Sequence, residues 1–461
     1  MNKVYDIAII GGGAAGLMAA AYASELLSDV KVVTPADQPS SPSILLLERM
    51  PRPGRKLNIT GKGSCNLTNA KMWDEFAPHV HPNRQFLKSA FYNFPSSSTM
   101  KFFENLGLEL VKERGDRVYP KSKRAMDVTD ALVGTIKQVG VVEMLTDSMV
   151  KTVKALKEDG KEEQLFEITY LMNTQQSLLY AKKILVTTGG LSYPSTGSTG
   201  DGYEIAKSFA HTIVPCYPSL TALIPAGYKE NENLSNFGKS LNGLLLKNIS
   251  MALKIDGNVV QEEFGDAEFT SGGLEGPLGF RVSRKAVDAL IKAQKVSVII
   301  DFKPALSELK LMARIKSDIK RALNRGVDSP IYINETKRLL KSLLPQKLID
   351  PFILSLKSDT LSVLRNRSLS KFALTSEQLA KALKNWELEI VGYVGYERSV
   401  VTAGGVSLKE ISPKTMESKL QRGLFFAGEV LDIDADTGGY NLQCAFSTAV
   451  LAISSMLQLK K

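Results

Sequence analysis

The residues best suited to chemistry in this chain are three glycines close to its start. Gly11, Gly13 and Gly16 have the spacing G-x-G-x-x-G, and they follow an apolar run of β-forming residues, Val4–Ile10. An alanine-rich run with helical spacing comes next, with Ala15 in its first turn. In such a turn the first glycine permits a tight bend, the second lets backbone approach a pyrophosphate, and the third lets helix pack on strand. The N-terminus of the helix would add free N–H groups and partial positive charge, so the pattern predicts a dinucleotide site.

A dinucleotide site of this kind also needs a carboxylate at the end of the second strand, where it accepts hydrogen bonds from ribose hydroxyls. Asp37 has the usual spacing of about 20 residues but lies in a loop rich in proline and serine. Glu48 lies farther along, yet it ends the apolar run "SILLLE". Because the acid must lie at the carboxyl edge of the sheet, we predict Glu48 as the ribose ligand and a loop at 34–43. Arg49 could contact adenine or phosphate, or be a solvated side chain.

The stretch "GRKLNITGKGSCNLTN" (54–69) directly follows the second predicted strand. Its glycines allow close backbone approach, its cations can meet phosphate charge, and its hydroxyl and amide groups add hydrogen-bond partners. The alternative is a surface loop that holds nothing. NAD rarely needs a second cradle of this kind, whereas the longer FAD does. The predicted FAD contacts of this stretch are Gly54, Arg55, Lys56, Thr60, Gly61, Gly63, Cys65 and Asn66.

The same stretch resembles a signature of a bacterial family of FAD-dependent flavoproteins. Members of that family are described as NAD(P)/FAD-dependent oxidoreductases, aminoacetone-oxidase-like or bile-acid-reductase-like proteins. The resemblance covers nearly the whole chain, and it is carried further by "DRVYPKSKRAMDVTDAL" (116–132), "TTGGLSYPSTGSTGDGYEIA" (187–206) and the segment 402–452. Lys62 and Ser64 stand where the family more often has glycine and arginine, which concerns substrate identity more than cofactor identity.

The resemblance implies that a later strand returns to the cofactor. The run "KKILVTTGG" predicts a buried strand that ends at Thr188, Gly189 and Gly190, and related flavoproteins place such a turn beside FAD. The backbone of Val150 would clamp the adenine. Val150 could equally be an ordinary residue of a strand core.

The resemblance also implies that the C-terminal segment completes the site. An apolar strand ends at Gly428 and Glu429, and the carboxylate would accept hydrogen bonds from the ribityl hydroxyls of FAD. An alanine-rich helix then begins, and the backbone N–H groups of Asn441, Leu442 and Gln443 would face the pyrimidine edge of the flavin. That placement stabilises negative charge on the reduced ring.

These elements predict an α/β fold: a Rossmann-like FAD-binding domain split by an insert. Alternating apolar residues predict an antiparallel, barrel-like β subdomain in the insert, and helical spacing predicts a helical subdomain. The predicted ranges are 1–193 and 401–461 for the FAD-binding domain, 194–303 and a return strand at 386–400 for the β subdomain, and 304–385 for the helices.

The predicted function is that of an FAD-dependent oxidoreductase, which passes hydride from NAD(P)H through flavin N5 to a small organic substrate. An activated C=C bond or a steroid-like enone is the favoured substrate. No second G-x-G-x-x-G occurs, so NAD(P)H is expected to bind transiently. Alternatives are a flavin amine oxidase of the aminoacetone type that uses oxygen, or an RNA-binding or RNA-modifying flavoprotein. Catalytic residues are not predicted; Cys65, Tyr193 and Tyr440 are candidates by residue type alone.

Composition describes an ordinary globular protein of two or three domains, with 461 residues, 44% hydrophobic and 23% charged. The net charge of +10 could mark an anionic partner, but a solvated basic surface is favoured, so no nucleic acid is expected. Three scattered histidines and three cysteines without C-x-x-C predict neither a metal site nor disulfides. No apolar run reaches about 18 residues, so a cytoplasmic protein with a small-molecule substrate is expected. The oligomeric state stays open.

Overall fold

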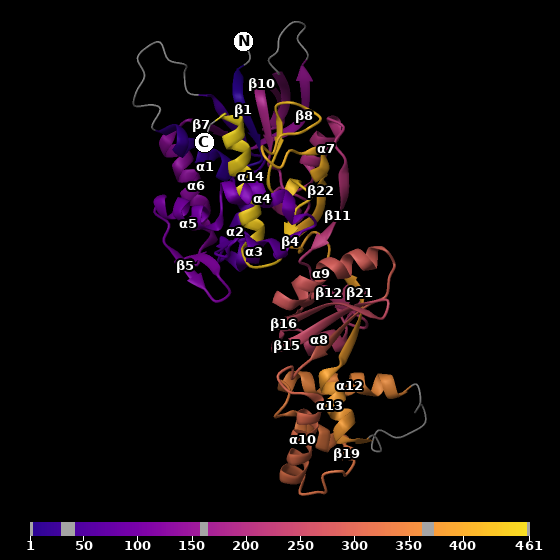
Figure 1. Cartoon of the computed structure of the whole chain (residues 1–461). Coiled ribbons are helices and arrows are strands. Elements are labelled where there is room, and N and C mark those ends of the chain that lie inside the picture. Colours follow the sequence, from indigo (N-terminus) through magenta and orange to yellow (C-terminus); the bar gives the residue numbers. More distant parts are fainter. Residues whose placement is uncertain (1–2, 29–41, 157–164, 362–372, 459–461) are drawn as a thin grey trace. The chain divides into compact units, whose positions relative to one another are not determined.

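The computed structural model divides the chain into two compact units (Figure 1). The first unit comprises residues 1–218 and 396–461, and the second comprises 219–395. The residues that the structure describes are 3–28, 42–156, 165–361 and 373–458. The first unit is thus assembled from both ends of the chain.

The boundaries between the units differ from the predicted ones at 193 and 400. Helix α7 (Asp201–Ser208) contacts strand β8 (Ser148–Leu156), and strand β11 (Ile213–Ser219) pairs with β22 (Val401–Val406). Because of these contacts, residues 194–218 belong to the first unit. The sequence had placed this segment in the β subdomain.

A seven-stranded sheet forms the centre of the first unit, with the order β7-β2-β1-β10-β9-β8 and with β23 beside β10. Five of its strands are parallel: β7 (Val142–Leu145), β2 (Ile44–Leu47), β1 (Val4–Ile10), β10 (Gln175–Val186) and β23 (Leu424–Phe426). Strand β2 is buried along its whole length, as a continuous apolar run in a covered parallel sheet should be. Because these strands are parallel, the residues that follow them meet at one edge of the sheet.

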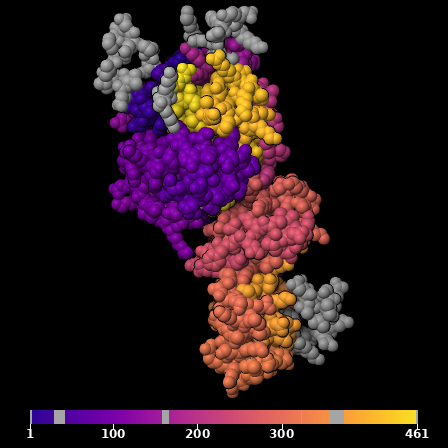
Figure 2. Space-filling view, viewed as in Figure 1, coloured from indigo at the N-terminus to yellow at the C-terminus, as the bar shows by residue number. Residues whose placement is uncertain are grey.

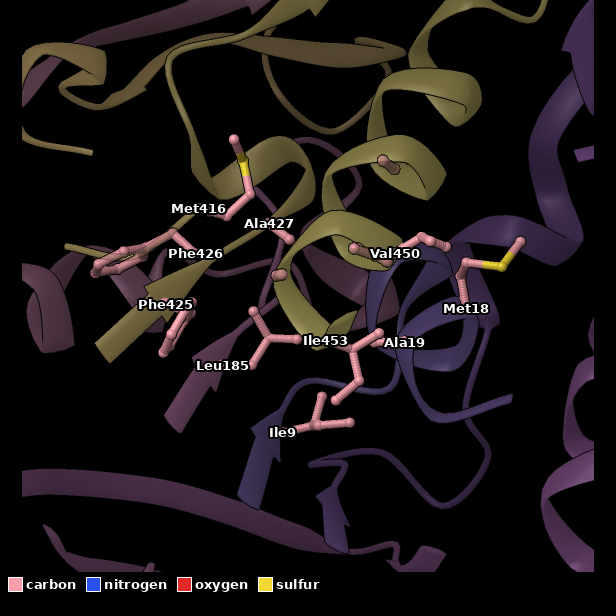
Figure 3. Packing of buried hydrophobic residues seen from close by; sticks show 14 of the residues in the cluster. Ile9, Met18, Ala19, Leu185, Met416, Phe425, Phe426, Ala427, Val450 and Ile453 are labelled. Carbon is pink, nitrogen blue, oxygen red and sulfur yellow. The ribbon is translucent and has the colours of Figure 1, made fainter. Parts of the chain in front are cut away.

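Helices α1 (Ala14–Ser28) and α14 (Tyr440–Met456) pack against each other and on this sheet. Figure 3 shows the resulting cluster, in which side chains from β1, α1, β10, β23 and α14 meet. Its labelled members include Ile9, Met18, Leu185, Phe426 and Ile453. Strand β23 and helix α14 therefore complete the core that β1 and α1 begin. Figure 2 shows the yellow C-terminal segment against the indigo and purple N-terminal segment.

Strand β9 (Leu165–Met172) pairs with β10 and β8 in the central sheet. The other elements of the first unit include α2 (Arg55–Ile59), β3 (Thr68–Asn69), α3 (Trp73–Phe76), β4 (Val80–His81), α4 (Arg84–Asn93), α5 (Ser96–Asn105), β5 (Leu110–Glu113), β6 (Arg117–Pro120), α6 (Ala125–Val139) and β24 (Asp434–Ala435).

The second unit contains a closed antiparallel barrel with the order β12-β17-β16-β15-β18-β21, which confirms the predicted barrel-like subdomain. Its strands are β12 (Leu223–Pro225), β15 (Leu244–Ile255), β16 (Asn258–Thr270), β17 (Gly273–Glu275), β18 (Val296–Asp301) and β21 (Trp386–Tyr393), with α8 (Asn236–Leu241) and α9 (Gly276–Ile291) beside them. Residues 308–384 supply the helices α10 (Glu308–Asp318), α11 (Ile333–Leu340), α12 (Gln346–Leu361) and α13 (Ser376–Lys384). Among the described residues, no helix has the length and apolar character needed to cross a membrane.

One buried histidine in the first unit makes stability depend on pH. The side chain of His211 is fully buried, its Nδ1 lies 3.1 Å from Glu410 Oε2, and its Nε2 lies 2.8 Å from Ser418 Oγ. Burial lowers the pKa of His211, although the hydrogen bond to Glu410 acts to raise it. The neutral imidazole is therefore favoured by folding, so stability is complete above about pH 6.5 and is lost as pH falls through the lower folded pKa.

We expect the Tm of the native chain to fall between pH 7 and pH 5. The fall should be about 2–4 °C for each kcal/mol lost from the free energy of unfolding. The variant His211→Gln keeps a hydrogen-bonding side chain but cannot titrate, so its Tm should fall less over the same range. Differential scanning fluorimetry measures both curves. Parallel curves for the two proteins would assign the acid sensitivity to other groups.

Candidate cofactor site

In the first glycine turn, a side chain would have room at Gly13 but not at Gly11 or Gly16. A Cβ on Gly16 would lie 1.9 Å from Gly11 O, and a Cβ on Gly11, whose φ is 105°, would lie 2.8 Å from Thr187 O. The Thr187 hydroxyl donates to Ile10 O (3.0 Å) and Gly11 O (2.8 Å), which fixes the turn. A Cβ on Gly13 would meet only Thr187 O, at 4.0 Å. Close packing therefore explains Gly11 and Gly16, whereas the space beside Gly13 is open.

Glu48 lies directly after β2, at the carboxyl edge where the sequence placed it. Its Oε2 accepts from the N–H of Gly12 and its Oε1 accepts from the N–H of Met50, each at 2.7 Å. Burial raises the pKa of Glu48, and the two N–H groups act in the opposite direction. The carboxylate thus ties the glycine turn to the end of β2. The rival acid, Asp37, lies outside the described residues.

Arg49 follows Glu48 directly in the chain, and Val150 lies near the start of β8. Arg49 Nη1 forms an ion pair with Asp201 Oδ2 at 2.7 Å, at the start of α7. Val150 is buried in β8, and the pairing of β8 with β9 is irregular between Val150 and Thr152. The N–H of Ser148 donates to Glu48 O at 2.8 Å, so the beginning of β8 lies beside the predicted ribose ligand. The interaction of Arg49 with α7 was not among the sequence-based alternatives.

The stretch 54–69 is attached directly to the first glycine turn. The N–H of Gly54 donates to Gly12 O at 2.8 Å. Gly54 has a φ of 72°, and a Cβ there would lie 2.6 Å from Thr129 Cγ2. Gly61 and Gly63 have φ values of 58° and 90°, and a Cβ on Gly63 would have no atom within 4 Å. The stretch therefore provides a second open backbone surface close to the first.

The cations of this stretch have different surroundings. Lys56 Nζ lies 2.7 Å from Glu429 Oε2, and Glu429 Oε1 accepts from the N–H of Thr402 at 2.8 Å. Arg55 and Lys62 are exposed. The structure therefore joins two predicted cofactor residues, Lys56 and Glu429, that are 373 positions apart in the sequence. The hydroxyl of Thr60 donates to the backbone at the end of α2, at 2.6 Å.

We expect a double-mutant cycle with Lys56→Met and Glu429→Gln to give a coupling of about 1 kcal/mol in the free energy of unfolding. The two side chains are 21% and 20% exposed, so the pair is less screened than a surface pair without being fully desolvated. Urea unfolding of the apo-protein, followed by circular dichroism, measures the cycle. A coupling within about 0.2 kcal/mol of zero would mean that solvent screens the pair as it does at an open surface.

The end of the stretch contacts the N-terminus of α14. With the Asn66 amide oriented so that both of its polar atoms are paired, its side chain donates to Thr68 O (3.1 Å) and accepts from the N–H of Gly439 (3.2 Å). A Cβ on Gly439 would lie 2.4 Å from the Thr68 carbonyl carbon, so only glycine fits there. The Thr68 hydroxyl donates to Gln443 Oε1 at 2.6 Å inside the core. The two halves of the predicted cradle, although far apart in sequence, therefore meet.

Of the three backbone N–H groups of α14 that were predicted to face the flavin, one already donates within the helix. The N–H of Gln443 donates to Gly439 O at 3.2 Å within the helix, which differs from the expectation that it faces a flavin. Within the described residues, no acceptor is found for the N–H groups of Asn441 and Leu442. The side chain of Asn441 accepts from the N–H of Ala435 (2.8 Å) and donates to its carbonyl (2.7 Å).

The turn after β10 contains a buried hydroxyl that lacks a partner. Thr188 Oγ1 is buried and makes no hydrogen bond with any described residue. Gly189 follows with a φ of 75°. A Cβ on Gly190 would lie 2.5 Å from Thr402 Oγ1. Because buried polar groups are nearly always paired, the Thr188 hydroxyl indicates a missing partner at this turn.

Gly428 brings the C-terminal segment against the first helix. Its φ is 77°, and a Cβ there would lie 2.8 Å from the Cβ of Ala15. Its N–H donates to Thr448 Oγ1 at 3.0 Å. The small residues Ala15 and Gly428 are therefore explained by close packing of α1 and the end of β23.

Two of the candidate catalytic residues, Cys65 and Tyr440, are buried, and the third, Tyr193, is half-buried. Burial raises the pKa of the Cys65 thiol to about 12 and also raises the pKa of Cys444. Both thiols therefore stay protonated at neutral pH, which does not suit a nucleophile. Burial raises the pKa of Tyr440 to about 12, and its ring stacks on His79 with centroids 4.3 Å apart. Tyr193 is half-buried with a left-handed backbone, φ 54°.

Three side chains of this region were missed from the sequence: Thr187, Thr402 and Asp436. Thr402 Oγ1 accepts from the N–H groups of Leu191 (2.8 Å) and Ser192 (3.1 Å). Thr187 and Thr402 each stand two residues before a Gly-Gly pair, so a repeated T-x-G-G pattern was available as a signal.

The third, Asp436, joins His79 and His81, two of the three histidines that the sequence analysis treated as scattered. Its Oδ2 lies 2.8 Å from His79 Nδ1 and its Oδ1 lies 3.3 Å from His81 Nε2. His81 lies on the short strand β4, paired with β24. The signal was the acidic run "DIDAD" just before the last helix.

Together these features fit an FAD cofactor. The backbone is open beside Gly13 and Gly63, the Thr188 hydroxyl lacks a partner, and the amides of Asn441 and Leu442 lack acceptors among the described residues. Glu48 lies at the edge where a ribose would be held. These groups occur around the carboxyl edge of one parallel sheet, and they match the polar contacts that a long dinucleotide requires.

Comparison with known proteins places the chain among relatives along its whole length. A family model described as "HI0933-like protein Rossmann domain" matches residues 5–455. A 3-dehydro-bile acid delta(4,6)-reductase of Clostridium scindens is 30% identical, and the alignment covers 98% of each chain. A ribosomal RNA dihydrouridine synthase of Haemophilus influenzae is 28% identical, over 97% of this chain and 98% of the relative. A ribosomal RNA dihydrouridine synthase of Escherichia coli is 24% identical over 99% of each chain.

Proposed function

The chain belongs to the HI0933-like family of FAD-dependent Rossmann oxidoreductases, and we propose that it saturates a C=C bond conjugated to a carbonyl group, with NAD(P)H as the reductant. The observation that carries this proposal is the 30% identity, over 98% of each chain, to a delta(4,6)-reductase of a 3-dehydro bile acid. A ketone conjugated with such double bonds is an enone. Dihydrouridine likewise forms when the C5–C6 bond of uracil, conjugated to the C4 carbonyl, is saturated. The relatives' names thus describe one type of reaction.

The proposed cofactor contacts come from three segments of the chain. We propose that the backbone at Gly13 and the N-terminus of α1 bind the pyrophosphate, and that Glu48 binds the adenosine ribose. The Thr188 hydroxyl would donate to the cofactor chain. Glu429 would bind the ribityl hydroxyls, held in place by Lys56. When bound, FAD supplies the hydride-carrying ring.

The helix α14 contributes the electrostatic part of the proposed site. The N–H groups of Asn441 and Leu442, with the partial positive charge of the helix N-terminus, favour negative charge on a ring beside them. Gly438 and Gly439 keep side chains away from that end, since both have left-handed backbones with φ values of 124° and 94°. Phe76 and Tyr440, the first residue of α14, are both buried and pack edge to face with ring centroids 4.9 Å apart.

The test is anaerobic reduction of the purified protein. The protein should carry a yellow chromophore that NADH or NADPH bleaches, and a conjugated enone should restore the colour. A colourless protein that takes up no FAD would contradict the cofactor assignment. Peroxide production with aminoacetone and no turnover of enones would favour the amine oxidase alternative.

A second candidate substrate is uracil within RNA, and the distribution of charge favours it. Residues 303–384 contain 17 Lys and Arg against 7 Asp and Glu, a net of +10. The remainder of the chain contains 41 residues of each sign, so this segment carries the whole net charge. Composition alone favoured a solvated basic surface. A solvated surface gives no reason for the positive charge to be concentrated in one segment, whereas binding of a polyanion uses such a concentration. Two of the relatives are named for an action on ribosomal RNA.

A further inference from the structure

Four acids of the helical segment, Asp318, Asp328, Glu335 and Asp350, form ion pairs within it, and its cations are in excess. Asp328 pairs with Lys316 (2.7 Å), and Asp350 pairs with Lys337 (2.6 Å). Glu335 pairs with Arg325 at 2.6 Å. In the described part of the chain, no ion pair involves Lys303, Lys310, Lys320, Arg338, Lys341 or Lys381. Among the described residues, these charges have no acidic partner, so an anion from outside the chain could pair with them.

Two of these lysines line one cavity of the second unit, together with a third from the barrel. The cavity has a volume of about 350 Å³ and lies where β15, the end of β18 and the α11–α12 connection meet. Its cations are Lys247, Lys303 and Lys341. The rest of its lining is Leu245, Leu246, Ile249, Phe302, Ser342, Leu343, Leu344 and Pro345. It belongs to the part of the second unit that is drawn in magenta to orange in Figures 1 and 2.

The cavity combines apolar and cationic side chains in its lining. Seven of its eleven lining residues are apolar, and one of them, Leu245, is 44% exposed although it is a large hydrophobic side chain. Among the described residues its lysines have no carboxylate partner, and burial together with the charge of Arg314 lowers the pKa of Lys303. An anion placed among the three ammonium groups would relieve that unfavourable charge, and a flat ring could cover the exposed Leu245.

We propose that this cavity binds one nucleotide of an RNA chain, with the phosphate at Lys247, Lys303 and Lys341 and the base against the exposed side chain of Leu245. The volume lies within the range of small-molecule sites, about 300–1,000 Å³. Outside the cavity, unpaired cations such as Lys310 and Lys381 add long-range attraction for a polyanionic strand rather than direct contacts with its phosphates. The inference deepens the second candidate substrate and depends on it. Its test measures binding without turnover, so it can fail while enone reduction is still observed.

The experiment compares two charge-matched triple variants of the full chain, both loaded with FAD. One combines Lys247→Glu, Lys303→Glu and Lys341→Glu in the cavity. The other combines Lys310→Glu, Lys320→Glu and Lys381→Glu outside it. The probe is a fluorescent 20-nucleotide uridine-rich RNA, titrated at several KCl concentrations with fluorescence anisotropy as the readout.

We expect the cavity variant to bind RNA on the order of 100-fold more weakly at 0.1 M KCl. The salt slope, which is the slope of log K against log KCl concentration, should fall in magnitude by about 2, because each lost phosphate contact with single-stranded RNA removes about 0.7. The outer variant should lose less than a third of that slope. Equal losses in the two variants, or no loss in either, would overturn the assignment of the cavity.

Two further measurements keep the result interpretable. A triple variant with Gln at the three cavity positions keeps polar side chains, so it tests the charges if the Glu variant folds poorly, and it should lose about 10–100-fold. Anaerobic bleaching by NAD(P)H should be unchanged, because these lysines are not in the cofactor site. Loss of binding to phosphatidylglycerol vesicles with RNA binding retained would assign the cavity to lipid headgroups and overturn the proposal.

Discussion

Replacing Gly13 with aspartate should abolish FAD binding while the apo-protein stays folded. A Cβ at this position meets only Thr187 O, at 4.0 Å, so a side chain has room within the protein. Gly13 precedes α1, where aspartate is a favourable cap. In the proposed site the same space holds the pyrophosphate. Like charges brought together cost several kcal/mol, so affinity should fall by more than about 100-fold.

The ratio of absorbance at 450 nm to that at 280 nm, with FAD titration by calorimetry, measures this effect. The variant Gly13→Asn has nearly the same volume without the charge, so it should lose less affinity than Gly13→Asp. In contrast, Gly16→Ala should destabilise the protein itself, because its Cβ would lie 1.9 Å from Gly11 O. If Gly13→Asp bound FAD as tightly as the native chain, the pyrophosphate would have to lie elsewhere.

The second large effect concerns Asp436, and we expect Asp436→Asn to lower the free energy of unfolding by about 2–3 kcal/mol at pH 7. Burial acts to raise the pKa of Asp436, but the hydrogen bonds with His79 and His81 outweigh it and lower the pKa to about 2. Its side chain is 19% exposed, so solvent screens these interactions only in part. Asparagine would lose the charge and leave one of the imidazoles without an acceptor.

The pH dependence has a definite sign. Because the folded pKa of Asp436 lies below its ordinary value near 3.8, the stabilisation is complete above about pH 5. It is lost as pH falls through the folded value near 2. Urea unfolding between pH 7 and pH 3 should therefore show a steeper acid loss in the native chain than in Asp436→Asn.

Histidine variants provide the control for this cluster. His79→Gln and His81→Gln should each cost less than Asp436→Asn, since one imidazole remains on the carboxylate. In the Asp436→Asn background they should add little. Full additivity of the three substitutions would mean that the groups do not act as a unit.

Much of the cofactor domain could be predicted from short stretches of sequence. The strand β1, the turn with Gly11, Gly13 and Gly16, and the helix α1 all lie where spacing placed them, because each depends on neighbouring residues. Glu48 lies at the end of β2 for the same reason: a strand context indicates the sheet edge. The antiparallel barrel followed from alternating apolar residues, and the structure joins its strands β15 and β16 through a turn at Asp256-Gly257.

Other features could not be predicted because they depend on which residues the sheet brings together. The sequence gives no reason for Lys56 to meet Glu429 or for Arg49 to meet Asp201, yet both pairs are 2.7 Å apart. It assigned 194–218 to the insert, although pairing of β11 with β22 includes this segment in the first unit.

The sequence by itself determined the type of cofactor site, since a strand, a glycine turn and a helix form locally from adjacent residues. Only the tertiary structure decided how the charged groups near that site are paired, and that Asp436 collects His79 and His81. It also decided that Lys247, Lys303 and Lys341 share one cavity. The physical reason is that local conformation depends on a few consecutive residues, whereas electrostatic pairing depends on distances that strand order and helix packing set across hundreds of residues.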